Sequence, residues 1–191
     1  GAGVKQRAEK SKTENVKVGG GTPSAIFNSM VNPLAPFAMR GGIWYQGESN
    51  GNEGMSYYHK KKALVNGWRK LFNPHLAFYW VQLANWQKRR DKSAGCDGWA
   101  KIREDQHKAA QDIPHTGMAT IIDIGEAGDI HPKNKQDVGD RLARWALNQT
   151  YNKSEIVPSG PLYKSHKVED GAIRVSFEHP GSGLIVGKKT G

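Results

Sequence analysis

The hydrophobic positions of this chain follow two different periods. Apolar residues recur at helical spacing over residues 57–72 and 99–113, and again from Pro132 to Gln149. Three short apolar runs have the length typical of buried strands: residues 42–46, 76–84 and 117–124. The resulting order of strand, helix, strand, helix, strand, helix is typical of an α/β domain, in which helices cover both faces of a mainly parallel sheet.

The two ends of the chain have a different pattern. Residues 1–22 are rich in Lys, Glu and Gly without sustained periodicity, so we expect a linker or surface excursion there. A short helix is predicted over residues 24–31, and the α/β domain over residues 23–155. Beyond it, short strand-like runs separated by turns predict a β-rich element over residues 156–191: residues 160–163, 172–178 and 183–186.

Composition adds limits on the class of protein. The 191 residues are 37% hydrophobic and include six Trp, as in ordinary globular domains. No apolar run approaches the roughly 20 residues of a membrane span. The single cysteine, Cys96, excludes an internal disulfide framework and a multi-cysteine zinc site. Localisation stays open, with a secreted, periplasmic or lysosomal-type compartment compatible with the chain.

A formal net charge of +10 favours anionic partners, which include acidic sugars, nucleic acids and membrane surfaces. The basic residues, however, are scattered and lie mostly beside Glu, Gln or Asp, without an aromatic-interleaved stripe. We therefore interpret them as solvated faces and predict neither nucleic-acid nor membrane binding.

Two polar loops follow predicted strands: residues 46–50 and residues 123–131. Because the carboxyl ends of parallel strands lie at one edge of a sheet, we expect these loops to meet there. His131 is our candidate general base, and a carboxylate such as Asp129 can fix the tautomer of an imidazole and stabilise its charged form. The alternative is that His131 merely precedes Pro132 and caps a helix.

The first loop matches Gly-x-Ser-x-Gly around Ser49, the pattern of a nucleophile elbow. An elbow requires a helix directly after the serine, whereas residues 50–54 are poor helix formers, so Ser49 is a disfavoured nucleophile. The loop is better suited to stabilise an oxyanion, because Gln46 or Asn50 can donate amide hydrogens and Gly47 permits close backbone approach. Glu48 either orders the loop by hydrogen bonding or is an exposed charge without a role.

Two long strings in this chain resemble the sialate O-acetylesterase family. The first is Arg-Gly-Gly-Ile-Trp-Tyr-Gln-Gly-Glu-Ser-Asn at residues 40–50, and the second is Asp-Ile-His-Pro-Lys-Asn-Lys at residues 129–135. Residues 23–34 and the Ser-Gly-Pro-Leu-Tyr string at residues 159–163 add to the resemblance, which runs from about residue 22 to about residue 186.

The resemblance implies a three-layer α/β/α fold of the SGNH-hydrolase (flavodoxin-like) type, a serine nucleophile and no metal or cofactor. Related enzymes carry the serine in a Gly-Gln-Ser-Asn-Met-like string early in the domain. That string is absent here, so we expect the serine upstream of this chain. The resemblance places Gln46, Gly47, Glu48 and Asn50 in the family's middle block.

The same resemblance makes His131 the base and Asp129 its orienting acid. In SGNH hydrolases this acid commonly lies three residues before the histidine, where this chain has Gly128, so Asp123 is the fallback. The implied reaction is removal of O-acetyl groups from sialic acid or other acetylated sugars, with a substrate that carries negative charge in the sialic acid case. The rival interpretation is a non-catalytic domain that binds acidic glycans on Trp44, Tyr45 and Trp86.

Overall fold

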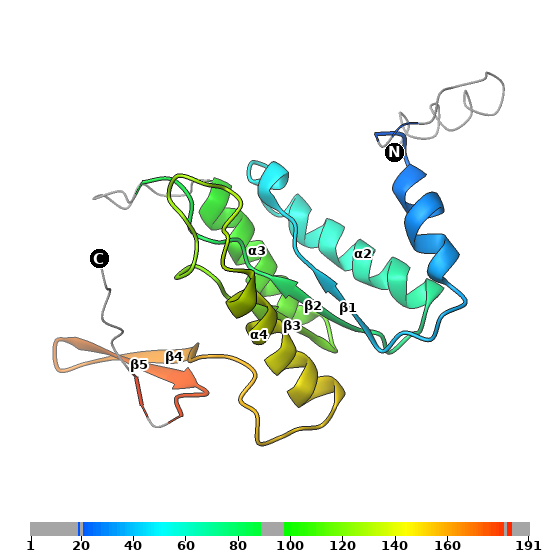
Figure 1. Cartoon of the computed structure of the whole chain (residues 1–191). Helices are drawn as coiled ribbons and strands as arrows, with labels where there is room; N and C mark the ends of the chain where they lie inside the picture. The colour runs from blue at the N-terminus through cyan, green and yellow to red at the C-terminus, as the bar shows by residue number, and fades with distance from the viewer. Residues whose placement is uncertain (1–18, 20, 89–97, 182, 185–191) are drawn as a thin grey trace.

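The computed structural model describes residue 19, residues 21–88 and 98–181, and residues 183–184 (Figure 1). Most of the predicted linker over residues 1–22 therefore lies outside the described residues. The chain first forms a π-helical turn, η1 (Phe27–Val31), and a short 3-10 helix, η2 (Asn32–Leu34), in the region where a short helix was predicted. Pro33 lies within the first turn of η2, a position that proline tolerates.

The described part of the α/β domain is built on a parallel sheet with the order β1-β2-β3. Its strands are β1 (Gly41–Trp44), β2 (Ala77–Val81) and β3 (Thr116–Ala119). Each is connected to the next by a helix, α2 (Ser56–Leu71) and then α3 (Gly98–Asp112). The last helix, α4 (Lys135–Trp145), continues into the π-helical turn η4 (Ala146–Thr150). The predicted α/β class and parallel sheet are confirmed.

Helices cover both faces of this sheet because the side chains of β2 alternate between two apolar clusters. Phe78 and Trp80 pack with residues of α2 and α3, including Val65 and Ala109. Tyr79 belongs to the cluster on the opposite face, to which α4 contributes Val138 and Leu142. All five residues of β2 are buried, as expected of a central parallel strand. Figure 1 shows the resulting three layers.

Two predicted boundaries are wrong for identifiable reasons. Pro132 does not open the last helix, which begins at Lys135 because Asn134 is its N-cap and accepts a hydrogen bond from the Asp137 backbone N–H at 3.2 Å. The third strand is shorter than the predicted run of residues 117–124. It ends at Ala119, after which the chain turns.

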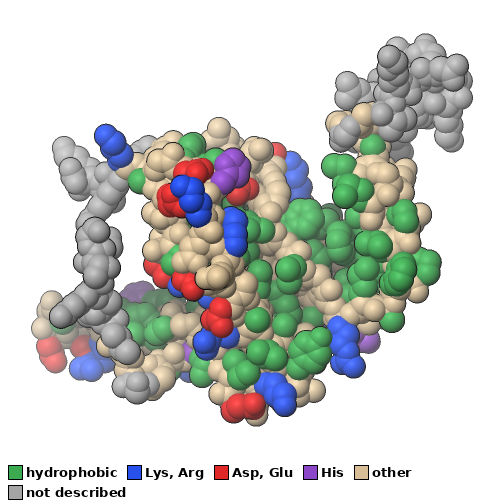
Figure 2. Space-filling view, viewed as in Figure 1, with side chains coloured by type: hydrophobic (Ala, Val, Ile, Leu, Met, Phe, Trp, Pro, Cys, Tyr) green, Lys and Arg blue, Asp and Glu red, His purple; other side chains and the backbone are tan. Residues whose placement is uncertain are grey.

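β1 has a neighbour on one side only among the described residues. Its central side chain, Ile43, is 70% exposed, although it lies in a sheet strand. Large apolar side chains of the preceding segment are also exposed, including Met30 and Phe37. Figure 2 shows apolar side chains gathered on this side of the molecule.

The predicted β-rich element contains an antiparallel hairpin of β4 (Leu162–Glu169) and β5 (Ala172–Glu178). Most residues of both strands are exposed, and the hairpin stands apart from the α/β layers in Figure 1. The third predicted strand, residues 183–186, is not formed at Gly183 and Leu184, and the rest of that run lies outside the described residues.

Candidate active site

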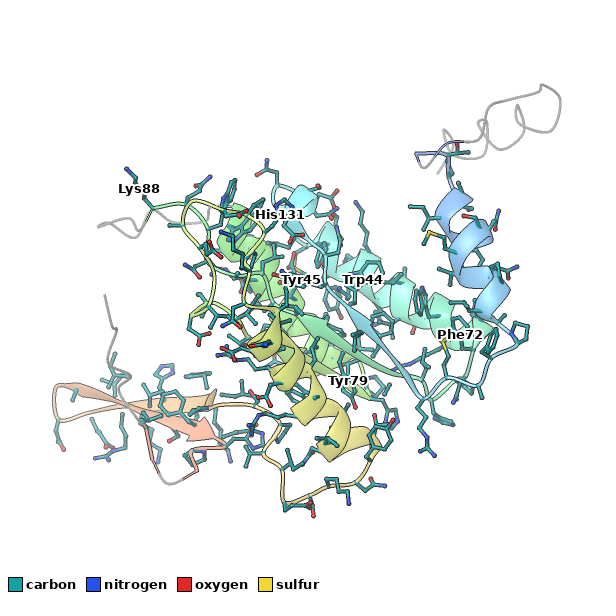
Figure 3. The ribbon with its side chains drawn as sticks, in the orientation of Figure 1. Trp44, Tyr45, Phe72, Tyr79, Lys88 and His131 are labelled. Atoms are coloured by element: carbon teal, nitrogen blue, oxygen red, sulfur yellow. The ribbon has the colours of Figure 1, made fainter. Side chains whose placement is uncertain are left out.

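The two polar loops meet at the carboxyl edge of the sheet, as predicted from their strands. They line a cleft of about 180 Å³. Tyr45 and Glu48 contribute from the loop after β1, and Ile130, His131, Pro132 and Lys135 from the segment that leads into α4. Figure 3 shows Tyr45 and His131 at the same end of the sheet.

The loop after β1 is ordered by hydrogen bonds between its own side chains. The Gln46 amide nitrogen donates to Asn50 Oδ1 at 2.5 Å, which fixes the orientation of the Gln46 amide and leaves its second N–H unassigned. The Gly47 backbone N–H donates to Glu48 Oε2 at 2.9 Å. Glu48 therefore orders the loop, one of the two roles considered for it, and the Gly47 N–H already binds an anionic oxygen.

Ser49 does not have the surroundings of a nucleophile elbow. It lies in the short 3-10 helix η3 (Glu48–Asn50) and is exposed, and helix α2 begins only at Ser56. Of the predicted loop residues only Glu48 lines the cleft with His131, whereas Ser49 does not, and neither do Gln46, Gly47 and Asn50. The geometry thus favours a nucleophile other than Ser49.

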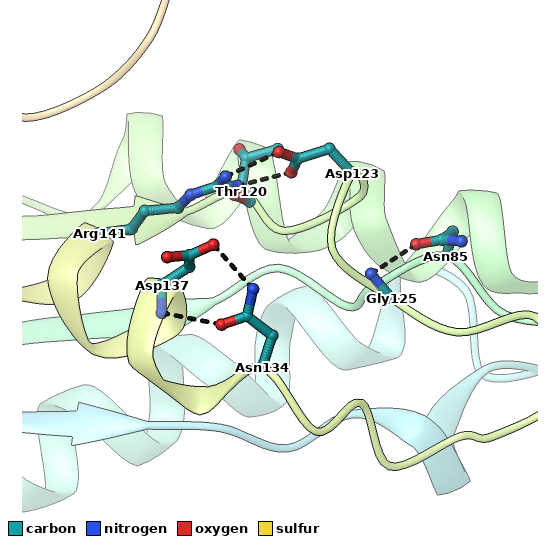
Figure 4. A network of polar contacts seen from close by, with 7 residues as sticks. All are labelled: Asn85, Thr120, Asp123, Gly125, Asn134, Asp137 and Arg141. Carbon is teal, nitrogen blue, oxygen red and sulfur yellow. Dashed lines mark hydrogen bonds and ion pairs between the residues drawn. The ribbon is translucent and has the colours of Figure 1, made fainter. Parts of the chain in front are cut away.

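Two hydrogen bonds attach the loop that carries His131 to the segment that follows β2. The Gly125 N–H donates to Asn85 Oδ1 at 2.8 Å (Figure 4). The Gln87 N–H donates to the Ala127 carbonyl at 3.0 Å. A Cβ at Gly125 would overlap both oxygens of Asn85, so only glycine fits this approach. Polar contacts of the backbone therefore position the loop that carries His131.

Glu126 closes the same loop from within. Its carboxylate accepts a hydrogen bond from the Lys133 backbone N–H at 3.0 Å, and its carbonyl accepts one from the Asp129 N–H at 3.3 Å. These contacts bracket His131 on both sides in the sequence. The sequence predicted that this loop belongs to the site, but it did not identify Glu126 as the residue whose hydrogen bonds hold the loop together.

His131 is open to solvent, with 86% of its side chain exposed. Its backbone N–H donates to Asp129 Oδ1 at 2.8 Å, and its ring Nδ1 lies 3.6 Å from the same oxygen. That separation exceeds a hydrogen bond, but it suffices for charge attraction once the imidazole is protonated. Catalytic hydrogen bonds are often long without substrate and shorten in the reacting complex. Asp129 is placed to orient His131, and this role stays a prediction.

Asp123, the fallback acid, is engaged elsewhere. Its two carboxylate oxygens accept from Arg141 Nη1 and Nη2 at 2.6 and 2.7 Å, and Arg141 also donates to the Thr120 carbonyl (Figure 4). The hydrogen bonds from Arg141 hold the pKa of Asp123 below its ordinary value. Because both oxygens are used, the geometry favours Asp129 over Asp123 beside His131.

Tyr45 and Lys135 also belong to the cleft. Tyr45 was predicted only as part of the aromatic platform in the rival interpretation, and Lys135 was not predicted as a site residue. The Lys135 ammonium lies 4.7 Å from the centre of the Tyr45 ring, a cation–π contact. Burial, and after it the Glu48 carboxylate, raises the pKa of Tyr45. Lys135 lies within the quoted family string, which was a usable signal. Its proximity to Tyr45 depends on the fold and could not be predicted from the neighbouring residues in the sequence.

The aromatic platform of the rival interpretation is not formed. Trp44 packs into the core beside α2, with its ring centre 6.5 Å from that of Trp68 and 6.4 Å from that of Phe78. Trp86, in contrast, is 37% exposed and packs against Trp99. The three proposed platform residues therefore do not share one open surface.

A larger hollow of about 530 Å³ lies elsewhere, between α4, the end of β3 and residues 157–162. None of the predicted site residues lines it. Within the described residues, no helix is long and apolar enough to cross a membrane, and no group of three or more His, Cys, Asp or Glu side chains is placed to hold a metal ion.

Similarity to known proteins assigns the chain to a family. A family model described as "Carbohydrate esterase, sialic acid-specific acetylesterase" matches residues 17–148. The chain belongs to this family. The sialate O-acetylesterase of Mus musculus is 28% identical to it across 86% of the chain, and that of Homo sapiens is 31% identical across 73%.

The family membership extends to solved structures. The crystal structure of a carbohydrate acetylesterase from Xanthomonas citri is similar to this chain with a TM-score of 0.71 and 40% sequence identity, over 81% of the chain. The chain covers 34% of the mouse sialate O-acetylesterase, 29% of the human one and 36% of the Xanthomonas chain. It thus spans about one third of the length of these relatives.

Proposed function

We propose that this chain is the histidine-bearing part of a carbohydrate esterase that removes O-acetyl groups from sialic acid or other acetylated sugars through a covalent acyl-serine intermediate. The observation that supports it most is the cleft that Glu48, in the Gln46–Asn50 loop, lines together with His131. A general base and a set of oxyanion donors on opposite walls are what acyl transfer requires. Family membership supports the same reaction class.

In this mechanism His131 takes the proton of the serine hydroxyl as that oxygen attacks the acetyl carbonyl. It then gives the proton to the departing sugar oxygen, and in the second half it activates water to release acetate. Asp129 stabilises the imidazolium that forms at each proton transfer. The second amide N–H of Gln46 and the Gly47 N–H would donate to the tetrahedral oxyanion, with Asn50 holding the Gln46 amide in place.

Among the described residues, one edge of β1 has no neighbouring strand, which supports a proposal for how the nucleophile reaches this cleft. A parallel strand added to that edge would end at the carboxyl edge of the sheet, beside Glu48. A serine in the loop after such a strand would enter the cleft opposite His131. We therefore place the nucleophile on an upstream strand that pairs with β1 and covers Ile43.

Lys135 supports an anionic substrate within this proposal. Its ammonium lies at the cleft and belongs to none of the ion pairs of the described residues. A carboxylate on the sugar, as in sialic acid, would complement that charge. The substrate class is thus an acetylated carbohydrate, with an acidic sugar favoured.

The test is hydrolysis of an aryl acetate and of an O-acetylated sialic acid by the 191-residue chain and by a longer polypeptide that includes the upstream region. We expect turnover from the longer polypeptide only. His131→Ala should lower its kcat by about 10³-fold or more, because the base is lost. Ser49→Ala should leave kcat near that of the wild type, because the Ser49 side chain is exposed and does not line the cleft with His131. Loss of activity in Ser49→Ala, or near-normal rates in His131→Ala, would refute the assignment.

A further inference from the structure

The carbonyl of Gln46 accepts hydrogen bonds from two buried side chains on different helices. The Tyr57 hydroxyl of α2 donates to it at 2.8 Å, and the Gln106 amide nitrogen of α3 donates at 3.4 Å. Tyr57 is 3% exposed and Gln106 is fully buried. Burial raises the pKa of Tyr57 to about 12, so its hydroxyl keeps its proton and donates throughout the neutral range.

These two contacts determine the direction of the Gly47 backbone N–H, which lies beside Glu48 of the cleft. The Gln46 carbonyl and the Gly47 N–H belong to one planar trans peptide unit, in which they point in opposite directions. The buried donors hold the carbonyl toward Tyr57 and Gln106, so the N–H points away from them. It donates to the Glu48 carboxylate, which lines the cleft with His131.

The same two side chains explain why residue 47 is glycine. A Cβ at this position would lie 3.1 Å from Gln106 Nε2, 3.2 Å from Ile102 Cδ1 and 3.3 Å from the Tyr57 hydroxyl oxygen. Few real Cβ contacts are that short, and the neighbours are buried. Close approach of the backbone to Tyr57 and Gln106 is therefore what the glycine permits.

Gln106 also ties this loop to the central strand. Its Oε1 accepts from the Leu83 backbone N–H at 2.9 Å, just past the end of β2, and its own carbonyl accepts from Trp80 Nε1 at 3.1 Å. A buried side chain with both ends of its amide engaged is a rigid link, because moving it would leave buried polar groups unpaired. Gln106 thus fixes the position of the loop after β1 relative to the end of β2.

We propose that Tyr57 and Gln106 are positioning residues of the active site, which hold the Gln46 carbonyl inward and thereby aim the Gly47 N–H at the oxyanion of the acetyl group. This inference rests on the proposed esterase function. During reaction the substrate oxygen replaces Glu48 Oε2 on this N–H, so Glu48 marks where the anionic oxygen binds. Tyr57 and Gln106 act through the backbone and touch no reacting atom.

The experiment uses Tyr57→Phe and Gln106→Met in the longer polypeptide, with rates normalised to active serine titrated by an aryl phosphonate. Each change should lower kcat for an aryl acetate by about 10- to 100-fold and leave KM within about threefold, since oxyanion donors act mainly on the transition state. Each test variant has a matched control: Tyr58 lies on α2 next to Tyr57, and Gln82 contacts α3, the helix that carries Gln106. Tyr58→Phe removes a hydroxyl that donates to Asp112, and Gln82→Leu removes an amide that donates to the Arg103 carbonyl.

The possible outcomes separate this inference from the function on which it rests. Loss of kcat in the two test variants, with both controls near wild type, supports positioning. Wild-type kcat in Tyr57→Phe, or a change in KM alone, overturns the inference and leaves the esterase function standing. Absence of turnover and of phosphonate titration in the wild-type polypeptide overturns both. Because Tyr57→Phe retains the Gln106 contact and the core ring, it tests the positioning role even if Gln106→Met does not fold.

Discussion

Replacing Lys61 with Met should stabilise the folded protein, because the wild-type amine lies inside an aromatic cage. Lys61 is 2% exposed, and its Nζ has no hydrogen-bond partner in the described part of the chain. Its neighbours are the rings of Trp44, Tyr57 and Trp80, whose centres lie 5.2–5.3 Å from Nζ. Met has similar length and no charge, so it fills the cage without an unpaired ammonium.

The magnitude follows from the proton affinity of the buried amine. Burial lowers the pKa of Lys61 from 10.5 to about 7. At about 1.4 kcal/mol for each pH unit, this difference corresponds to a loss of about 5 kcal/mol of stability while the amine is charged. At pH 7 we therefore expect Lys61→Met to raise the free energy of unfolding by several kcal/mol, with about 5 kcal/mol as the upper value.

The sign of the pH dependence gives a second observable. The unfolded chain keeps the Lys61 proton up to about pH 10.5, whereas the folded protein releases it above about pH 7. Between these values unfolding takes up a proton, so the stability of the wild type rises with pH across this window. Below pH 7 both states are protonated, and the cost of burying the charge is present in full. The advantage of Lys61→Met should therefore shrink as the pH increases.

Urea unfolding followed by tryptophan fluorescence at pH 7, 8 and 9 measures both quantities. Lys62→Met is the matched control, because Lys62 is the exposed neighbour on the same helix and its replacement leaves the cage unchanged. If Lys61→Met were no more stable than Lys62→Met at pH 7, or had the same pH slope, the reasoning about the buried amine would be refuted.

Two further predictions concern the segment that carries His131. Gly125→Ala should destabilise the protein by about 1–3 kcal/mol and lower kcat, because the new methyl overlaps Asn85; Gly128→Ala in the same loop meets nothing within 4 Å and is the control, so equal effects in urea unfolding and rate assays would contradict this account. Asn134→Ala should reduce stability by about 1 kcal/mol through loss of the α4 cap. An unchanged unfolding midpoint would show that the cap is dispensable.

Periodicity alone was enough to predict the layers of the α/β domain. Helices were expected on both faces of the sheet, and Val138 and Leu142 of α4, which recur at helical spacing, pack against the face opposite to α2 and α3. It did not predict where α4 begins, since both Pro132 and Asn134 carry helix-start signals and only the cap geometry distinguishes them. Where two local signals for a helix start are equally strong, the three-dimensional structure is needed to choose between them.

The candidate site was predictable where it depended on strand order and not where it depended on side-chain partners. The parallel strands bring Gln46 and His131 to one edge, and this required only the topology. Engagement of Asp123 by Arg141 required knowledge of which residue of α4 faces that loop. The burial of Lys61 was similarly hidden, because the helical pattern places it on the inner face but its cage comes from β1 and β2 as well.

The edge of β1 that has no neighbouring strand in the described part of the chain also bears on how the protein behaves at high concentration. An exposed strand edge offers free backbone donors and acceptors to any extended chain that approaches it, and Ile43 adds an apolar side chain to the same strand. Natural sheets block such edges with charges, prolines or bulges, whereas β1 reads Gly-Gly-Ile-Trp. A strand that paired with this edge would therefore prevent aggregation through β1 as well as extend the sheet.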